Sequence, residues 1–206
     1  MDIQGVPAVV TGGASGLGEA TARFLASQGA KVAVFDVQMV KAEAVAKDIG
    51  GIAVFCDVTS AGSAEQAMQT AKEAHGLCGI AVNCAGIGNP SRIIGREGPM
   101  TLDFFNKVIQ VNLVGSFNIL RLAADQMKDR EANADGERGV IISTASVAAF
   151  EGQIGQAAYS ASKGGIVAMT LPAARELAKF GVRVLAIAPG LFMTPMMESF
   201  SQEIQD

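Results

Sequence analysis

The sequence predicts an α/β fold built on one doubly wound parallel sheet, with helices on both of its faces. Short apolar runs of strand length alternate along the chain with longer segments of helical pattern. The runs are almost continuously apolar, as in parallel strands that are buried on both faces. The chain has 206 residues, half of them hydrophobic, so it fits one domain or at most two small ones. We expect a single domain over residues 1–206.

The first predicted unit is a strand, a glycine-rich turn and a helix. Residues 6–10 form a short apolar run, residues 11–18 read Thr-Gly-Gly-Ala-Ser-Gly-Leu-Gly, and residues 17–28 have a helical pattern closed by Gly29. Glycines let the backbone approach a bound pyrophosphate closely, and the free N–H groups at a helix start favour an anion. Glycines also serve ordinary tight turns, but the strand before this turn and the helix after it favour nucleotide binding.

The second predicted strand, residues 31–36, ends in Asp36. In a dinucleotide-binding unit, a carboxylate at this position accepts hydrogen bonds from the ribose hydroxyls of the adenosine. Because a carboxylate repels a 2′-phosphate, Asp36 favours NAD(H) over NADP(H). The alternative is that Asp36 is a solvated turn residue.

The middle of the chain continues the strand and helix alternation. We predict a helix over residues 39–48, a strand over 52–56, a helix from a capping box at 63–66 to near 76, and a strand over 80–83. Residues 87–100 read as a polar loop, in which Arg92 and Arg96 either face a phosphate-bearing substrate or are solvated. A long apolar helix over residues 101–127 contains Asn112 and should be buried on several sides.

Tyr159 and Lys163 lie in a predicted helix that ends near Phe180. Their spacing places the phenol and the ammonium on one helix face, one turn apart. A phenol has an ordinary pKa of about 10, so proton exchange near neutral pH requires a nearby cation that stabilises its anion. Ser146 ends the preceding predicted strand, residues 140–146, and a sixth strand follows over residues 182–188. An exposed Tyr and Lys on an ordinary helix is the alternative for this pair.

Composition excludes several classes of function. The net charge is −4, and Lys and Arg form no runs, so we expect neither nucleic acid nor a membrane surface as a partner. With one histidine and three cysteines that lack CxxC spacing, we expect no metal site. We see no secretory signal and no apolar run of membrane-spanning length. These features fit a reducing compartment, the cytoplasm of a bacterium or the mitochondrial matrix of a eukaryote.

The ordered motifs resemble those of the short-chain dehydrogenase/reductase family, whose members have a Rossmann fold. The resemblance spans essentially the whole chain and rests on the turn at residues 11–18, Asn-Cys-Ala-Gly at 83–86, Asn112, Ser146, Tyr159, Lys163, Pro189 and Gly190. More narrowly, residues 142–153, Gln156 and residues 188–192 look like the type 2 3-hydroxyacyl-CoA dehydrogenase branch. The resemblance implies an NAD-dependent enzyme that interconverts 3-hydroxyacyl-CoA and 3-oxoacyl-CoA.

The resemblance also implies roles for four catalytic residues. Tyr159 would be the general base in alcohol oxidation, and Ser146 would hold the substrate oxygen. Lys163 would bind the nicotinamide ribose and lower the pKa of Tyr159. Asn112 would position a water that links Lys163 to solvent.

Further site residues follow from the same resemblance. The implied cofactor-binding residues, besides Tyr159 and Lys163, are Gly12, Ser15, Gly16, Leu17, Gly18, Asp36, Asp57, Val58, Cys84, Ala85, Gly86, Pro189, Gly190, Phe192 and Thr194. The substrate would contact Ser146 and Tyr159, with Gln153 and Gln156 lining the acyl pocket. We expect a homotetramer, because the helices near Asn112 and after Lys163 commonly form subunit contacts in this family.

Other functions stay open at this point. Within enzymes, the alternatives are a 3-oxoacyl-carrier-protein reductase and a hydroxysteroid dehydrogenase; outside enzymes, the alternative is a nucleotide-sensing or RNA-processing scaffold. Family members usually continue beyond the position that matches Asp206 with a substrate lid, a seventh strand and a tail. We therefore expect this chain to lack these parts, and its sixth strand to be paired or covered either by missing chain or by a neighbouring subunit.

Overall fold

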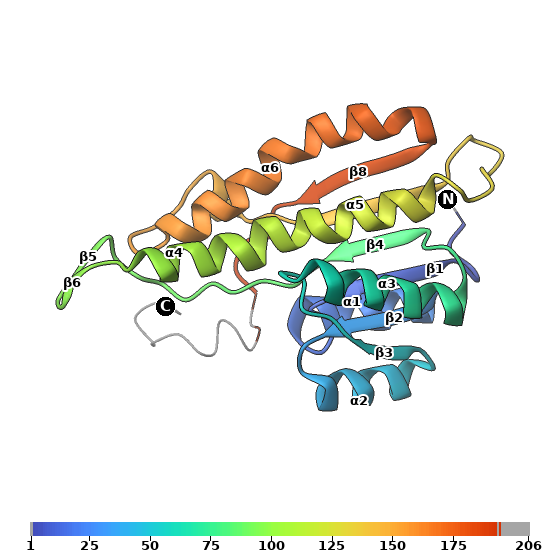
Figure 1. Cartoon of the computed structure of the whole chain (residues 1–206), viewed down its shortest axis with the longest axis horizontal. Helices are drawn as coiled ribbons and strands as arrows, with labels where there is room; N and C mark the ends of the chain where they lie inside the picture. Colours follow the sequence, from blue (N-terminus) through green and yellow to red (C-terminus); the bar gives the residue numbers. More distant parts are fainter. Residues whose placement is uncertain (1, 193, 195–206) are drawn as a thin grey trace.

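The structure is a computed structural model that describes residues 2–192 and 194. Six parallel strands form the main sheet in the order β3-β2-β1-β4-β7-β8 (Figure 1). The strands are β1 Pro7–Thr11, β2 Lys31–Asp36, β3 Ile52–Phe55, β4 Ile80–Asn83, β7 Gly139–Thr144 and β8 Val182–Ile187. This sheet confirms the predicted doubly wound α/β fold.

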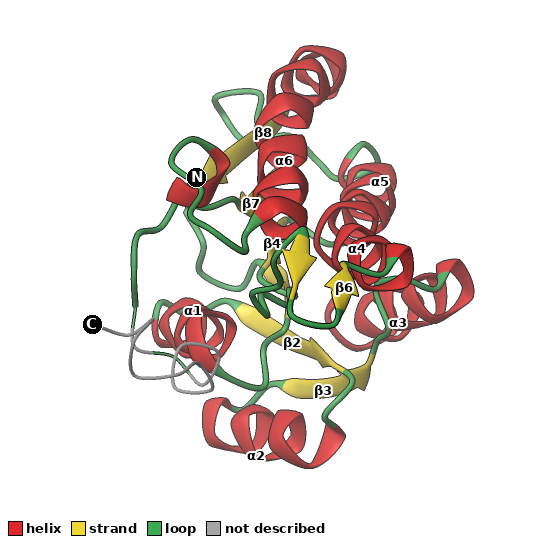
Figure 2. Cartoon of the chain, turned by 90° about the vertical axis from the view of Figure 1, so that its left-hand side faces the viewer, coloured by secondary structure: helices red, strands yellow, loops and turns green. Residues whose placement is uncertain are grey.

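Helices cover both faces of the sheet, as the view of Figure 2 shows. Helices α1 Gly16–Ser27 and α2 Met39–Ile49 pack on one face. The other face carries α3 Ala61–His75, α5 Gly115–Met127 and α6 Ala157–Leu177. Helix α4 Leu102–Ile109 runs into α5 through a π-helical turn, Gln110–Val114. No helix within the described residues is both long and apolar enough to cross a membrane.

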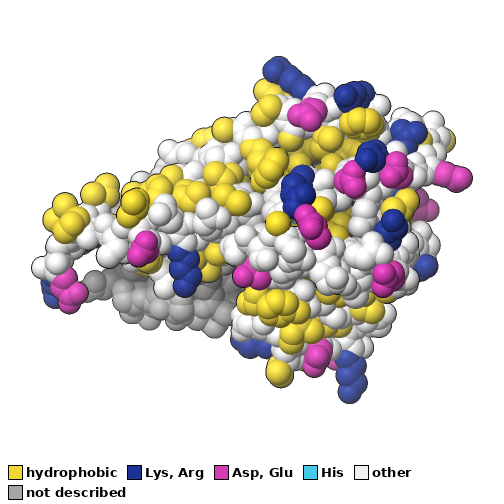
Figure 3. Space-filling model, viewed as in Figure 1, with side chains coloured by type: hydrophobic (Ala, Val, Ile, Leu, Met, Phe, Trp, Pro, Cys, Tyr) yellow, Lys and Arg dark blue, Asp and Glu magenta, His cyan; other side chains and the backbone are white. Residues whose placement is uncertain are grey.

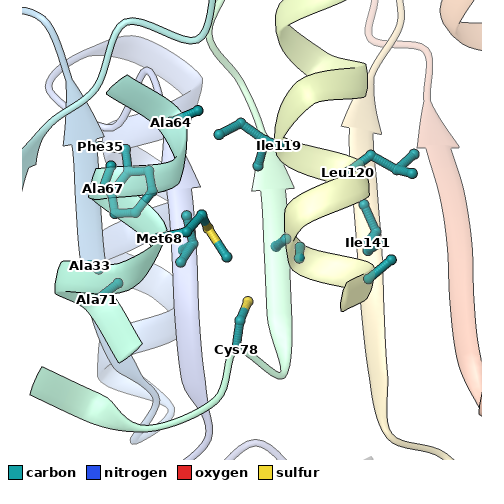
Figure 4. Packing of buried hydrophobic residues seen from close by; sticks show 14 of the residues in the cluster. Ala33, Phe35, Ala64, Ala67, Met68, Ala71, Cys78, Ile119, Leu120 and Ile141 are labelled. Carbon is teal, nitrogen blue, oxygen red and sulfur yellow. The ribbon is translucent and has the colours of Figure 1, made fainter. Parts of the chain in front are cut away.

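The core has one layer on each face of the sheet. Figure 4 shows the layer under α3 and α5, in which Phe35, Met68, Ile119 and Ile141 belong to one cluster that extends across the strands. All four side chains are almost fully inaccessible to solvent. Burial of side chains of this size contributes about 1.5–3 kcal/mol each. This packing fixes α3 and α5 relative to the sheet, and hence the loops at their ends.

The strand order reverses between β1 and β4. After β3 the chain returns past β1 to add β4, β7 and β8 on the other side. Doubly wound sheets bind their ligands at such a switch point, beyond the carboxyl ends of the strands. The residues that follow Thr11, Asp36, Asn83 and Thr144 therefore lie at the edge where a site is expected.

Several local predictions were wrong. Helix α3 is capped by Ser60, whose hydroxyl accepts from the N–H of Ser63 at 3.3 Å. The predicted capping box at residues 63–66 fails because the Ser63 hydroxyl instead accepts from the N–H of Asp57 at 3.0 Å. The loop over residues 87–100 contains a small antiparallel hairpin, β5 Ile94–Gly95 and β6 Gly98–Pro99.

Strand β8 forms one edge of the sheet among the described residues. Its first residue, Val182, is buried, but Leu185 and Ile187 are exposed. An edge strand with exposed apolar side chains is usually covered in the native assembly. The sequence prediction that this strand is paired or covered therefore stays open.

Candidate active site

Ser146 and Tyr159 form a hydroxyl pair at the carboxyl edge of the sheet. Ser146 is the N-cap of a short 3₁₀ turn, Val147–Ala149, and its hydroxyl accepts from the N–H of Ala148 at 3.1 Å. The prediction that Ser146 ends a strand is wrong, because β7 stops at Thr144. Tyr159 lies in the first turn of α6, and its phenol lies close enough to the Ser146 hydroxyl for that hydroxyl to lower the pKa of the phenol. A substrate oxygen can meet both hydroxyls together.

Lys163 lies one helical turn after Tyr159 and is almost fully buried. Its ammonium donates to the carbonyl oxygen of Thr144 at 2.6 Å and lies 5.6 Å from the centre of the Tyr159 ring. Burial lowers the pKa of Lys163 from 10.5 to about 8. The ammonium is therefore largely charged at neutral pH, and one of its three N–H groups is engaged by the protein.

The prediction that Lys163 lowers the pKa of Tyr159 is wrong for this structure. Burial of the phenol raises the pKa of Tyr159 above its ordinary value, and the neighbouring Ser146 hydroxyl offsets only part of this rise. Burial dominates because it disfavours the phenolate, while the ammonium contacts a backbone carbonyl oxygen and not the phenol. These side chains alone hold Tyr159 as a neutral phenol near neutral pH.

Asn112 joins helix α6 to the loop after β4 through hydrogen bonds. It lies in the π-helical turn and is completely buried. Its Nδ2 donates to Ile87 O at 2.9 Å and to Ser162 Oγ at 3.0 Å, while its Oδ1 accepts from Ile87 N at 2.8 Å. Ser162 Oγ in turn donates to the carbonyl oxygen of Tyr159 at 2.7 Å. Ser162 was not identified from the sequence, where it is one hydroxyl among several.

The glycine-rich turn brings backbone atoms close together. A Cβ at Gly12, where φ is +63°, would lie 2.8 Å from Ala85 Cα, and one at Gly18 would overlap the carbonyl oxygen of Gly12. Gly16 opens helix α1, with Leu17 next, and the N-cap Ser15 makes no side-chain capping bond. The first N–H groups of α1 are thus left for an anion. This backbone arrangement fits the pyrophosphate of a dinucleotide.

Asp36 lies at the end of β2 and is buried. Its two carboxylate oxygens accept from the N–H groups of Ala14 at 3.1 Å and Gln38 at 2.9 Å. The carboxylate thus joins the glycine-rich turn to the next loop, which rules out the solvated-turn alternative. Asp57 follows the neighbouring strand β3, and its carboxylate accepts from the N–H and the hydroxyl of Thr59 at 2.9 Å and 2.7 Å.

The loop after β4 closes the space between the glycine-rich turn and Lys163. The hydroxyl of Thr11 accepts from the N–H groups of Cys84 and Ala85, each at 3.2 Å. A Cβ at Gly86 would lie 3.3 Å from Asn112 Oδ1 and 3.8 Å from Lys163 Nζ. Thr11 was missing from the predicted site residues, although it precedes the glycines of the motif.

Of the predicted residues after β8, Pro189 lies at the same edge. The carbonyl oxygen of Pro189 accepts from the N–H of Val147 at 3.1 Å, which joins this segment to the turn that Ser146 caps. Gly190 follows, and Phe192 is exposed. Thr194 is half-buried.

Gln153 and Gln156 line a separate hollow of about 650 Å³, together with Arg92, Ile93, Ile94, Phe150, Ile154 and Ser160. The side-chain oxygen of Gln156 accepts from the N–H of Gln153 at 2.9 Å, so the two residues stabilise one loop. Neither is hydrogen-bonded to Ser146 or Tyr159 among the bonds of the described residues. The hollow adjoins the hydroxyl pair through Ala148 and Ser160, each close in sequence to one of the two hydroxyls.

The three cysteines are protonated thiols near neutral pH, so none of them acts as a thiolate. All three are unpaired. Burial raises the pKa of Cys56 and of Cys78 to about 12, and it also raises the pKa of Cys84. Within the described part of the chain, no cluster of His, Cys, Asp or Glu could hold a metal ion.

Comparison with known proteins identifies the family. The profile of the family described as short chain dehydrogenase matches residues 7–205. The chain belongs to the short-chain dehydrogenase family. This confirms the resemblance drawn from the motifs. The roles of individual residues in this short-chain dehydrogenase stay predictions.

Named relatives narrow the resemblance within the short-chain dehydrogenases. The human protein named 3-hydroxyacyl-CoA dehydrogenase type-2 is 52% identical over 206 residues, which cover 98% of this chain and 79% of the relative. The protein of the same name from Drosophila melanogaster is 49% identical over 207 residues, which cover 98% of this chain and 81% of the relative.

Two solved short-chain dehydrogenase structures are similar over most of the chain. One is 3-hydroxyacyl-CoA dehydrogenase type-2 from Mycobacterium avium, with 42% identity and a TM-score of 0.86 over 95% of this chain and 78% of that one. The other is 3-ketoacyl-(acyl-carrier-protein) reductase from Brucella melitensis complexed with NADH. It has 33% identity and a TM-score of 0.88 over 98% of this chain and 82% of that one.

Proposed function

We propose that this short-chain dehydrogenase is an NAD-dependent oxidoreductase that interconverts 3-hydroxyacyl-CoA and 3-oxoacyl-CoA thioesters. The observation that carries the proposal is the neighbouring hydroxyls of Ser146 and Tyr159, one helical turn from buried Lys163 and beside the glycine-rich turn. The substrate class rests on relatives at about 50% identity that are named for this activity.

The chemistry of the proposed reaction divides between the cofactor and the chain. NAD, when bound, supplies a hydride acceptor and a positive charge that favours ionisation of the nearby phenol. Tyr159 takes the proton of the substrate hydroxyl, and Ser146 donates a hydrogen bond to the same oxygen. Because Lys163 lies one turn away and keeps N–H groups free, it binds ribose hydroxyls and carries the proton onward. Asn112 holds this helix in place and positions a water near Lys163.

The cofactor is held mainly by backbone groups. The N–H groups of residues 15–18 bind the pyrophosphate, with Gly12 and Gly18 giving it room. Asp36 accepts hydrogen bonds from the adenosine ribose, and Asp57 and Val58 contact the adenine. The remaining proposed contacts come from Cys84, Ala85, Gly86, Pro189, Gly190, Phe192 and Thr194.

The hollow beside the hydroxyl pair is the proposed place for the acyl part of the substrate. Exposed apolar side chains of Ile93, Phe150 and Ile154 surround it, with the amides of Gln153 and Gln156. An apolar surface with a few polar groups is typical of a small-molecule site. Arg92 lines this hollow and also an adjoining one with Arg96, so it lies where a phosphate-bearing substrate would extend.

A 3-oxoacyl-carrier-protein reductase is the second candidate. A specific observation favours it, because the Brucella melitensis reductase matches this chain with a TM-score of 0.88. That structure is complexed with NADH, so cofactor choice does not separate the two candidates, and the carrier of the acyl group must. A hydroxysteroid dehydrogenase is a third candidate enzyme. A purely nucleotide-sensing scaffold is disfavoured, because it would not need the Ser146, Tyr159 and Lys163 arrangement.

One substrate panel tests these candidates. Acetoacetyl-CoA, an acetoacetyl carrier protein and a steroid ketone are each offered with NADH, and turnover is followed by the loss of NADH absorbance. We expect the highest kcat/KM with acetoacetyl-CoA. A higher value for the carrier protein or the steroid would reject the proposed substrate. Binding of NADH without turnover of any substrate would favour the scaffold.

The remaining proposals concern assembly and compartment. We propose that residues 1–206 act as one dinucleotide-binding catalytic unit within a homotetramer. Leu102, Phe117 and Leu171 are exposed on α4, α5 and α6, and Figure 3 shows hydrophobic side chains along the band of these helices. Light scattering that finds only monomers would reject the tetramer. The unpaired cysteines support a reducing compartment, bacterial cytoplasm or mitochondrial matrix.

A further inference from the structure

A buried amide on helix α5 contacts the loop that follows β3. Asn118 Nδ2 donates to Val58 O at 3.0 Å and lies 3.4 Å from Ser60 O. Asn118 is only 7% exposed. The loop at residues 57–60 leaves the sheet next to Asp36, since the N–H of Cys56 donates to Asp36 O at 3.2 Å. Helix α5 thus reaches the backbone of the loop that carries Asp57 and Val58.

Arg121 fixes the orientation of the Asn118 amide. Its Oδ1 accepts from Arg121 Nε at 2.9 Å, so its Nδ2 must point to the carbonyl oxygens of the loop. Arg121 is itself held by Glu65 of α3, with Nη2 to Oε1 at 2.9 Å. An amide with both ends engaged and little access to water cannot exchange its partners without loss.

A second contact from α5 fixes the same loop. A Cβ at Gly115 would lie 2.5 Å from Val58 Cγ2, so the absence of a side chain there lets Val58 pack against the helix. The Val58 side chain is consequently buried. Its backbone, and the Asp57 carboxylate beside it, are then what the loop offers to a ligand.

We propose that Asn118 is a positioning residue for the adenosine end of the cofactor site, and that it acts by holding the backbone of residues 57–60. The inference rests on the proposed function, in which Asp57 and Val58 contact the adenine. Asn112 fastens the loop at the nicotinamide end, and Asn118, on the same continuous helix, fastens the loop at the adenosine end. The continuous helix formed by α4, the π-helical turn and α5 therefore positions both ends of the proposed cofactor site.

The Asn118→Asp substitution tests the proposal directly. It keeps the size of the side chain and its bond to Arg121, but it replaces the donor that faces Val58 O and Ser60 O with a carboxylate oxygen. We expect the Kd for NADH to rise about 10-fold, because an unmatched buried acceptor costs more than a lost bond. The kcat at saturating NADH should stay within about twofold, because the hydroxyl pair is untouched.

Gln126→Glu is the matched control on the same helix. Gln126 Nε2 donates to Met68 O at 3.2 Å and its Oε1 accepts from Cys78 N at 3.0 Å. Cys78 lies just before β4, so these contacts lie near the amino ends of the strands, away from the proposed site. This substitution also sets a carboxylate oxygen against a carbonyl, so it should lower Tm comparably. The Kd for NADH should remain that of the wild type.

Binding of ADP localises the effect. ADP carries only the adenosine half of the cofactor, so its Kd should rise in Asn118→Asp by the same factor as that of NADH. An unchanged Kd for ADP and NADH in Asn118→Asp would overturn the proposal, as would an equal rise in Gln126→Glu. If Asn118→Asp does not fold, Arg121→Met carries the test with an expected rise of about 2–3-fold, and an unchanged Kd would overturn it. Failure of the wild type to bind NADH would instead reject the proposed function.

Discussion

The two ends of the proposed cofactor site differ in which atoms define them. At the adenosine end, backbone groups dominate: Gly12 and Gly18 remove side chains, and Asp36 holds the N–H groups of Ala14 and Gln38. At the nicotinamide end, side-chain groups dominate: the hydroxyls of Ser146 and Tyr159 and the ammonium of Lys163. Binding at the first end depends on close approach, whereas chemistry at the second depends on particular functional groups.

This difference predicts two kinds of variant. Removing the Tyr159 phenol at the nicotinamide end should lower kcat and leave the fold and cofactor affinity nearly unchanged. Adding atoms at the adenosine end should lower affinity and stability together, because the backbone must move. A variant that mixes these behaviours would weaken the comparison.

The largest effect is expected for Tyr159→Phe. The substitution removes the proton acceptor and keeps the ring, so kcat should fall by about 10²–10⁴-fold. The Kd for NADH, measured by fluorescence titration, should stay within about twofold. A Phe variant that retains more than about a tenth of wild-type turnover would contradict the role given to the phenol.

Gly18→Ala should have the next largest effect. The added Cβ overlaps the carbonyl oxygen of Gly12, so the glycine-rich turn must shift. We expect a loss of about 1–3 kcal/mol in the free energy of unfolding and at least a tenfold rise in the Kd for NADH, measured by denaturant titration and fluorescence. Gly62→Ala is the control, because a Cβ at Gly62 in α3 meets nothing within 4 Å. Equal behaviour of the two variants would remove the argument from close approach.

The sequence predicted the frame of the site because that frame follows from local patterns. β2 and β4 were predicted to the residue, and the spacing of Tyr159 and Lys163 predicted one shared helix face. Asp36 could be found because it ends a buried strand after a glycine-rich turn. These signals depend on neighbours in the chain, and burial then brings the separate segments together.

The features that sequence reasoning missed depend on distant partners. Asn118 and Ser162 bind carbonyl oxygens, and every residue has a carbonyl oxygen, so the sequence carries no sign of the pairing. The direction of the Tyr159 pKa was also wrong. It is set by burial of the phenol and by the hydrogen bond from Lys163 to Thr144 O, and neither of these follows from helical spacing.

Asp36→Asn sharpens the comparison at the adenosine end. Its amide keeps only one of the two oxygen acceptors that serve Ala14 and Gln38, and it removes the charge that repels a 2′-phosphate. A hydrogen bond to a charged group contributes about 1.5–3 kcal/mol, so the preference for NADH over NADPH should fall about 10–100-fold. The ratio of kcat/KM for the two cofactors measures it. An unchanged ratio would show that the carboxylate does not select the cofactor.

Lys163→Met gives the smallest expected change, a gain in stability that accompanies the loss of activity. Burial lowers the pKa of Lys163 from 10.5 to about 8, which corresponds to roughly 3 kcal/mol at about 1.4 kcal/mol per pKa unit. The lost bond to Thr144 O returns about 1 kcal/mol or more of this. We therefore expect the inactive Met variant to be more stable by about 1–2 kcal/mol at pH 7.

The pH dependence separates this charge effect from packing. Below pH 8 the buried lysine is charged in the folded state and its cost is fully present. Between pH 8 and 10.5 the unfolded chain binds more protons than the folded one, so wild-type stability rises with pH relative to the variant. Urea unfolding at pH 7 and pH 9.5 should therefore show a difference between the two proteins that shrinks. A constant difference would mean that methionine stabilises by packing alone, and that the ammonium at the nicotinamide end is held at no cost to the fold.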